Sequence, residues 1–237
     1  MTDPQHELLA AIRTGLAAAG DPDKAPRMQA YMKSAMPYHG VPAPGQRQLF
    51  RAVFTAHPLP DRECWLATVR ALWDDATHRE ERYAAIELTG ARAYARWQGP
   101  DLVPSLYRDM IVTGAWWDYV DDIAIGRVGP LLHSAPGPVT PIVKAWSAGG
   151  ELWLRRASII CQIGRKAYTD TDLLTLTIDR AAGEREFFAR KAIGWALREY
   201  AKTNPDWVRG FVADRAGRLS PLSVREAVKH LGPAAVL

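Results

Sequence analysis

Cysteine and long apolar runs are scarce in this chain of 237 residues. Its two cysteines, Cys64 and Cys161, are too few for a disulfide framework, a four-thiolate zinc site or an iron–sulfur cluster. No apolar run approaches the roughly 18–20 residues that cross a membrane, and the first residues, MTDPQHE, lack the basic and apolar regions of a signal peptide. We therefore expect a cytoplasmic protein with no membrane association.

Several common catalytic signatures are also absent. The sequence contains no GxSxG, P-loop, GxGxxG or HExxH motif, and its six histidines are scattered. These motifs hold nucleophiles, phosphates, dinucleotides and zinc ions, respectively. We accordingly expect no metal ion, no nucleotide cofactor and no nucleophilic triad.

Helix-forming residues dominate what is present. Ala and Leu together number 59, whereas Val and Ile number only 25, which favours an all-α fold over a β-sandwich or a parallel sheet. Helical periods bounded by Pro, Gly and capping residues follow one another, with no linker or low-complexity stretch between them. The predicted helices lie near 4–19, 22–36, 44–57, 61–75, 78–98, 101–113, 115–132, 138–148, 151–165, 170–182, 184–203, 205–217 and 221–231.

So many helices with short connections are too many for the core of one bundle. Antiparallel helical pairs of about 35–45 residues, by contrast, stack on one another indefinitely, because each pair buries a face of its neighbour. We therefore predict a single domain over residues 1–237, organised as an α-solenoid with a concave surface.

Positive charge is concentrated in the second part of the chain. The net charge of +4 divides into −2 for residues 1–139 and +6 for residues 140–237. A basic concave face suits a phosphate-rich partner, although a modest positive charge also serves solubility.

The segment 115–132 carries a carboxylate at the edge of its apolar face. At about 100° per residue its apolar side chains gather on one side. Asp118 and Asp122 fall on the opposite, solvated side, whereas Asp121 falls at the boundary, one turn after Trp117. A partly buried carboxylate beside an indole acts strongly on a nearby cation. The same position also suits an aspartate that only pairs with an arginine.

The segment 151–165 places Arg156 in the middle of an apolar stripe, with Trp153 beside it. Burying an unpaired guanidinium costs on the order of several kcal/mol, so Arg156 requires an anion. That anion is a carboxylate such as Asp121, a phosphate, or both in a shared groove. A structural ion pair between helices is the alternative interpretation.

The segment 184–203 places a large aromatic residue among cations. Trp195 shares one helical face with Lys191, Arg198 and Lys202, at spacings of four, three and four residues. This combination suits a sugar–phosphate surface. Alternatively, another helix covers Trp195 and the cations extend past it to solvent.

Three segments together resemble the AlkD family of DNA alkylation repair glycosylases: WWDYVD at 116–121, WLRRASI at 153–159 and KAIGWALREYAKTNPDWV at 191–208. The early AYMK at 30–33, HGVPAP at 39–44 and LSxREAxKHL within 219–231 are similar to the same family, so the resemblance covers nearly the whole chain. It implies an all-α solenoid of HEAT-like (ARM-type) helical pairs, with a basic concave face that cradles duplex DNA.

The resemblance also implies an activity: hydrolysis of the N-glycosidic bond of positively charged N3- and N7-alkylpurines in double-stranded DNA. The catalytic residues of the family match Asp121, Trp117, Trp195 and Arg156. We expect no cofactor and a monomer. The family does not flip the base into a pocket, which implies tolerance of bulky adducts, and no lysine stands out for a Schiff base, which predicts a monofunctional enzyme.

The candidate DNA-binding residues are Tyr31, Arg47, Lys191, Arg198 and Lys202. Tyr31 matches the tyrosine of the YMK motif, and Arg47 is retained, whereas Ala43 and Gln46 depart from the family pattern. The alternative function is a non-catalytic helical-repeat scaffold that binds DNA or protein.

Overall fold

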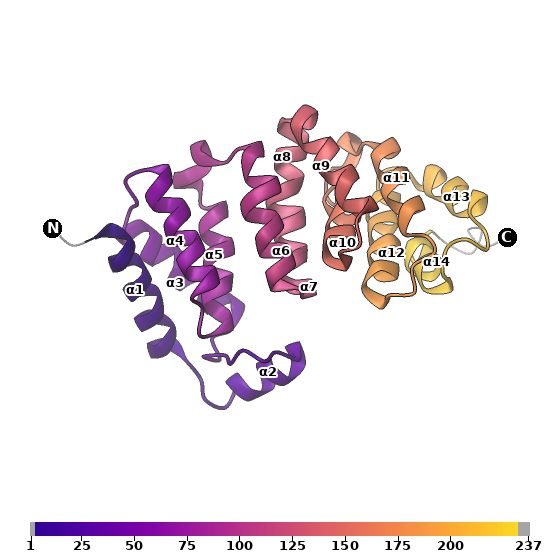
Figure 1. Ribbon diagram of the computed structural model, residues 1–237. Coiled ribbons are helices and arrows are strands. Elements are labelled where there is room, and N and C mark those ends of the chain that lie inside the picture. The colour runs from indigo at the N-terminus through magenta and orange to yellow at the C-terminus, as the bar shows by residue number, and fades with distance from the viewer. Residues whose placement is uncertain (1–2, 232–237) are drawn as a thin grey trace. The chain divides into compact units, whose positions relative to one another are not determined.

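The computed structural model describes residues 3–231 and is built almost entirely of helices (Figure 1). This described part contains fourteen α-helices and no strand. None of the helices within it is both long and apolar enough to cross a membrane. Contacts divide the chain into two compact units, Met1–Gln98 and Gly99–Leu237. The all-α fold is thus confirmed, while the single domain and the concave basic face remain predictions.

The first unit has a core of long helices that pack on one another. Its elements are α1 (Pro4–Ala19), α2 (Ala25–Met32), α3 (Ala43–Ala56), α4 (Arg62–Asp74), α5 (Arg79–Gly90) and the 3-10 helix η1 (Arg92–Trp97). Asp3 and Asp61 cap α1 and α4, because each carboxylate accepts a hydrogen bond from a backbone N–H of the first turn. Helices α1 and α5 contact each other, and each contacts both α3 and α4. Together the four helices enclose fully buried side chains such as Ile12 and Trp65.

A buried carboxylate fixes the chain that leads into α3. Glu80 of α5 accepts hydrogen bonds from the backbone N–H groups of His39 at 3.0 Å, Gly40 at 2.9 Å and Val41 at 3.3 Å. Gly40 has a φ of 88°, and a Cβ there would lie 2.2 Å from the carbonyl oxygen of Asp21. Only glycine fits this turn without displacing the backbone.

The second unit surrounds α10 with helices. Its elements are the 3-10 helix η2 (Pro100–Leu102), the π-helical turn η3 (Val103–Tyr107), α6 (Arg108–Gly114), α7 (Trp117–Ile123), the π-helical turn η4 (Ala124–Val128), α8 (Gly129–Ser134), α9 (Pro136–Ala148), α10 (Leu152–Ile160), the 3-10 helix η5 (Lys166–Tyr168), α11 (Thr171–Ala181), α12 (Phe187–Ala201), α13 (Pro205–Asp214) and α14 (Pro221–Val228). Helix α10 contacts α6, α7, α9, α11 and α12. It is therefore the element through which residues far apart in sequence are brought together.

Two glycines allow helices of this unit to approach closely. A Cβ at Gly129 of α8 would lie 2.2 Å from the carbonyl oxygen of Cys161. A Cβ at Gly194 of α12 would lie 2.4 Å from Cβ of Glu226 and 2.9 Å from the carbonyl oxygen of Ser223. Helix α14 thus packs directly on the backbone of α12.

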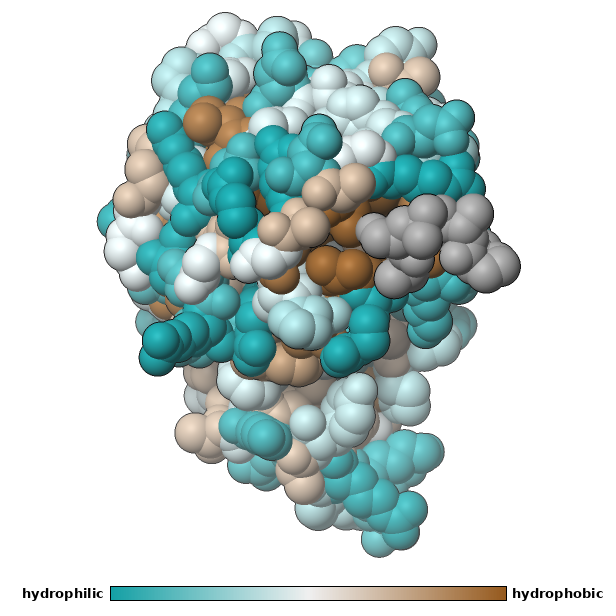
Figure 2. Space-filling view, turned by 90° about the vertical axis from the view of Figure 1, so that its right-hand side faces the viewer, coloured by the Kyte–Doolittle hydropathy of each residue, from teal (hydrophilic) through white to brown (hydrophobic). Residues whose placement is uncertain are grey.

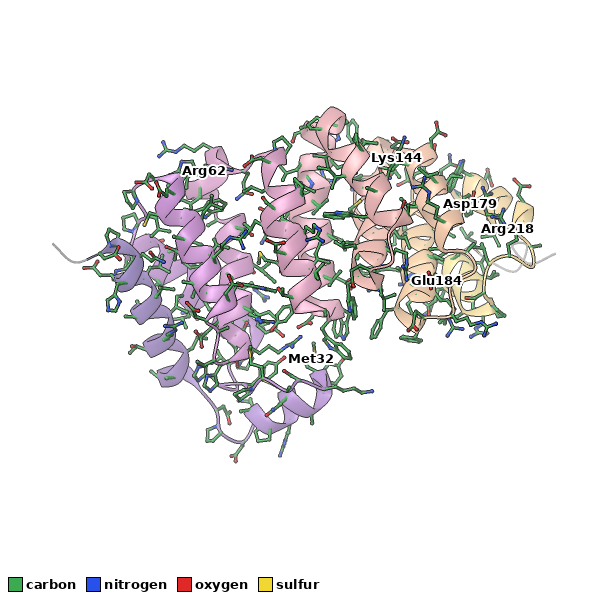
Figure 3. All side chains as sticks on the ribbon, in the orientation of Figure 1. Met32, Arg62, Lys144, Asp179, Glu184 and Arg218 are labelled. Atoms are coloured by element: carbon green, nitrogen blue, oxygen red, sulfur yellow. The ribbon has the colours of Figure 1, made fainter. Side chains whose placement is uncertain are left out.

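Ion pairs join neighbouring elements at the surface of this unit. The face in Figure 2 carries mainly hydrophilic side chains with a few hydrophobic ones between them. Asp179 of α11 accepts hydrogen bonds from Arg215 at 2.7 and 2.9 Å and lies 3.5 Å from a guanidinium nitrogen of Arg218 (Figure 3). These pairs join α11 to the chain that leads from α13 to α14.

Most predicted helix ends agree with the structure to within a few residues, but four segments differ. The helix predicted over 101–113 is divided among η2, η3 and α6, and its α-helical part begins only at Arg108. The helix predicted over 22–36 is only Ala25–Met32, because Lys33 adopts a left-handed conformation with φ 51°. The helix predicted over 78–98 ends at Gly90, and extended backbone at Ala91 separates it from η1. The helix predicted over 115–132 is interrupted by η4, which begins directly after α7.

Candidate active site

A buried ion pair joins α7 to α10 in the second unit. Nε and Nη2 of Arg156 donate hydrogen bonds to Oδ1 and Oδ2 of Asp121, each at 2.7 Å. The side chain of Arg156 is 6% exposed and that of Asp121 is 15% exposed. The sequence left a carboxylate such as Asp121, a phosphate, or both as the anion for Arg156, and the structure pairs it with Asp121. The pairing is bidentate, which is the strongest geometry for an arginine and a carboxylate.

A third helix holds the guanidinium from the other side. Nη1 of Arg156 donates a hydrogen bond at 2.7 Å to the backbone carbonyl of Phe188 at the start of α12. With the two hydrogen bonds to Asp121, three of the five N–H groups of Arg156 are used within the protein. The neighbouring Arg155 also pairs with a carboxylate, since its Nε lies 3.1 Å from an oxygen of Glu184. The guanidinium of Arg156 is fixed in orientation, and it fixes the Asp121 carboxylate in turn.

Aromatic rings surround this pair. The Trp195 and Phe188 ring centres lie 6.0 and 5.9 Å from Cζ of Arg156, at the outer limit of a cation–π contact. The rings of Trp116, Trp153 and Phe188 form an aromatic cluster, with centres 5.0–6.1 Å apart. Nε1 of Trp116 is buried and has no hydrogen-bond partner within residues 3–231.

Backbone geometry places Trp117 on the same helix as Asp121. Ala115 adopts a left-handed conformation with φ 42°, and Trp116 is extended, so α7 begins at Trp117. Four residues separate Trp117 from Asp121, which puts both side chains on one face of α7. Trp117 is partly exposed, so its indole is available to a bound molecule.

Burial raises the pKa of the Asp121 carboxyl above its ordinary value of 3.8. The hydrogen bonds and the charge of Arg156 act in the opposite direction, whereas Asp118 and Asp122 add to the increase. Arg156 thus offsets much of what burial costs the charged form. The result is an oriented negative charge whose side chain is more exposed than that of its cationic partner.

The three cations predicted to bind phosphates beside Trp195 each pair with a carboxylate. Lys191 donates to Glu226 of α14 at 2.9 Å, and Arg198 pairs with the same carboxylate. Nζ of Lys202 lies 2.7 Å from a carboxylate oxygen of Glu199. Binding of DNA phosphates by these residues stays a prediction. A phosphate would compete with Glu226 and Glu199 or use the N–H groups that these carboxylates leave free.

The remaining two candidates belong to the first unit. Tyr31 lies on α2 and is 76% exposed. Arg47 lies on α3, is exposed, and lines a cavity of about 720 Å³. Its neighbour Gln46 is buried and donates a hydrogen bond at 2.6 Å to the carbonyl of Val41, so this departure from the family pattern has a structural role at the start of α3.

A second cluster has the composition of a metal site. His39, His78 and Glu81 offer potential ligand atoms within 4.8 Å of one another. Both oxygens of Glu81, however, already accept hydrogen bonds, from Thr77 and the His78 backbone on one side and from Arg13 on the other. The cluster is therefore explained by the cap of α5.

Sequence reasoning missed Phe188. Its backbone carbonyl accepts from Arg156, and its ring completes the aromatic cluster. A signal was present, because Phe188, Lys191 and Trp195 follow one another at spacings of three and four residues and so share one face of α12.

The chain as a whole is similar to known proteins. A family model described as DNA alkylation repair enzyme matches residues 12–231. A solved structure described as a predicted DNA alkylation repair enzyme from Enterococcus faecalis is 31% identical, with a TM-score of 0.80, over 90% of this chain and 97% of that one. No curated protein matches the chain.

Proposed function

The chain belongs to the DNA alkylation repair enzyme family, and from this premise we propose that it is a DNA glycosylase. Its substrates are N3- and N7-alkylpurines, such as 3-methyladenine and 7-methylguanine, in double-stranded DNA. The reaction is hydrolysis of the N-glycosidic bond, with release of the damaged base and an abasic site as products.

The observation that supports this proposal best is the bidentate pair of Asp121 and Arg156. Arg156 lies deeper, with three N–H groups bound to protein acceptors, while the carboxylate of Asp121 lies nearer to solvent. Each carboxylate oxygen uses one lone pair for Arg156 and keeps another for a ligand. The pair can therefore act on a bound ligand as well as join α7 to α10.

The chemistry follows from the charge of the substrate. Alkylation at N3 or N7 gives the purine a formal positive charge, so cleavage of the bond to C1′ returns the electron pair to nitrogen and releases a neutral base. No general acid is needed for that departure. The deoxyribose then carries positive charge, as in other glycoside hydrolyses.

In this mechanism Asp121 stabilises the developing sugar cation and positions the attacking water. A fixed carboxylate in a partly dried site stabilises such a charge far more than water does, because no reorganisation is required. The oxygen of water bonds to C1′ and its proton passes to solvent. Arg156 positions Asp121, and Trp117 and Trp195 lie against the sugar and backbone, where their π faces favour positive charge.

The family resemblance adds two features to the proposal. The base stays in the duplex instead of being flipped into a pocket, which accommodates bulky adducts. The enzyme is monofunctional, so no strand cleavage accompanies base release. Tyr31, Arg47, Lys191, Arg198 and Lys202 are proposed to hold the DNA backbone.

Product analysis tests the proposal. A duplex with a single 7-methylguanine is incubated with the protein, and the free base is measured by chromatography. We expect release of 7-methylguanine and heat- or alkali-labile sites, with no strand cleavage before that treatment. Intact substrate at enzyme excess, with DNA bound, favours the non-catalytic scaffold. Loss of DNA binding at every salt concentration favours a scaffold for protein partners, because phosphate contacts make affinity salt-dependent.

A further inference from the structure

The first unit contains a second feature with the dimensions of a binding site. Its cavity of about 720 Å³ lies among α3, α5 and η1 and is lined at its rim by Arg47, as described above. Small-molecule sites typically enclose roughly 300–1,000 Å³. All lining residues belong to residues 47–97, so the cavity is complete within this unit.

The cavity is strongly basic. Four arginines line it, Arg47, Arg51, Arg92 and Arg96, against a single acidic residue, Glu87. Among the residues that the structure describes, none of these four arginines forms an ion pair, in contrast to Lys191, Arg198 and Lys202. All four are exposed, so their N–H groups are available to a phosphate, which accepts several of them at once.

One wall of the same cavity is a fixed aromatic surface. Tyr94 and Trp97 stack with ring centres 4.9 Å apart and planes inclined by 8°. The Tyr94 hydroxyl accepts a hydrogen bond from the backbone of Leu59 at 3.0 Å, and Arg62 donates to the carbonyl of Trp97 at 3.1 Å. Tyr94 is buried, whereas Trp97 is partly exposed. Cζ of Arg96 lies over the Trp97 ring, 5.2 Å from its centre, so a base that stacks on this ring takes the place of Arg96.

We propose that this cavity binds a nucleotide, with the phosphate among the arginines and the base against Trp97. Arginine binds the phosphate group, which every nucleotide has, and an aromatic ring stacks with any of the bases. The site is therefore expected to bind nucleotides without selecting one base. The nucleotide is either free in solution or part of an unpaired stretch of a DNA strand. This assignment goes beyond the proposed function, because it does not depend on Asp121. It shares Arg47 with the residues that are proposed to hold the DNA backbone.

Calorimetric titration of the full-length protein with deoxyadenosine 5′-monophosphate tests the assignment. Deoxyadenosine and inorganic phosphate serve as separate probes, and both should bind at least about fivefold more weakly than the nucleotide. Arg92→Ala and Trp97→Leu should each weaken nucleotide binding by at least about fivefold. Arg27→Ala, an exposed arginine on α2 outside the cavity, serves as the matched control and should change nothing.

Three results would overturn the assignment: no binding of the nucleotide, equal binding of nucleotide and inorganic phosphate, or unchanged binding by Arg92→Ala. Displacement of the nucleotide by a short single-stranded oligonucleotide, but not by duplex, identifies a DNA strand as the source. Failure of the oligonucleotide to displace it identifies free nucleotides. The titration is repeated with Asp121→Asn, which should bind the nucleotide as the wild type does. Nucleotide binding and base release are thus measured independently, so either proposal can fail without the other.

Discussion

Replacing Arg156 with methionine should strongly destabilise the second unit. The change removes a guanidinium that is 6% exposed and leaves the Asp121 carboxylate, itself only 15% exposed, without its counter-charge. It also leaves the Phe188 carbonyl without the donor that now lies 2.7 Å away. Removing one member of a buried pair costs about 3–5 kcal/mol, and the residual exposure of Asp121 places the expected loss near the lower end, at about 3 kcal/mol.

The double variant Asp121→Asn with Arg156→Met separates charge burial from lost packing. With no carboxylate left to bury, it should recover roughly 2 kcal/mol relative to Arg156→Met alone. Urea unfolding at neutral pH, followed by circular dichroism, measures both differences, with Arg27→Met as the exposed control. A loss below about 0.5 kcal/mol for Arg156→Met, or a double variant no more stable than the single one, would refute the reasoning.

Three further predictions concern pH and packing. Burial raises the pKa of Asp121, and the carboxylate is the active form, so the rate of base release should increase with pH. The midpoint of that increase in a pH–rate profile should lie above 3.8, and a midpoint below 3.8 would contradict the prediction. Gly194→Ala should destabilise the protein by about 1–3 kcal/mol, because a Cβ there would lie 2.4 Å from Cβ of Glu226. Gly210→Ala in α13, where a Cβ would meet open space, should be neutral or stabilising by up to about 1 kcal/mol. Thermal unfolding compares the two variants. Burial and the charge of His78 lower the pKa of His39 from 6.5, against the opposing charges of Glu80 and Glu81. The unfolded chain therefore binds the proton more tightly, and stability should fall as the pH drops below that value. His39→Gln should reduce the difference in melting temperature between about pH 7.5 and about pH 5.5, and an unchanged difference would count against this explanation.

Local signals in the sequence predicted where most helices begin. The carboxylates of Asp3 and Asp61 and the prolines at the starts of α13 and α14 act within one turn, so no tertiary information was needed. The interruption of 115–132 at η4 was not predicted, because the apolar period continues through Gly126 and the change to π-helical hydrogen bonding depends on packing.

The candidate site shows the same division between local and tertiary information. The boundary position of Asp121 and the buried position of Arg156 followed from helical periodicity. The requirement to neutralise a buried guanidinium limited its partner to a carboxylate such as Asp121, a phosphate, or both, and only the fold selects among them. The carbonyl of Phe188 could not be found in this way, because every residue has one and only the fold selects it. Glu226 reaches Lys191 and Arg198 only because Gly194 lets α14 approach α12, a contact that no single-helix pattern contains.

The most direct test of the central claim is the single-turnover rate of 7-methylguanine release by Asp121→Asn, measured beside its affinity for the same duplex. Asp122→Asn, an exposed aspartate that follows Asp121 on α7, is the matched control. The proposed mechanism predicts that Asp121→Asn loses at least about a hundredfold in rate, as when a main electrostatic stabiliser is removed, with DNA affinity retained. Base release by Asp121→Asn at the rate of wild type and of Asp122→Asn would contradict it.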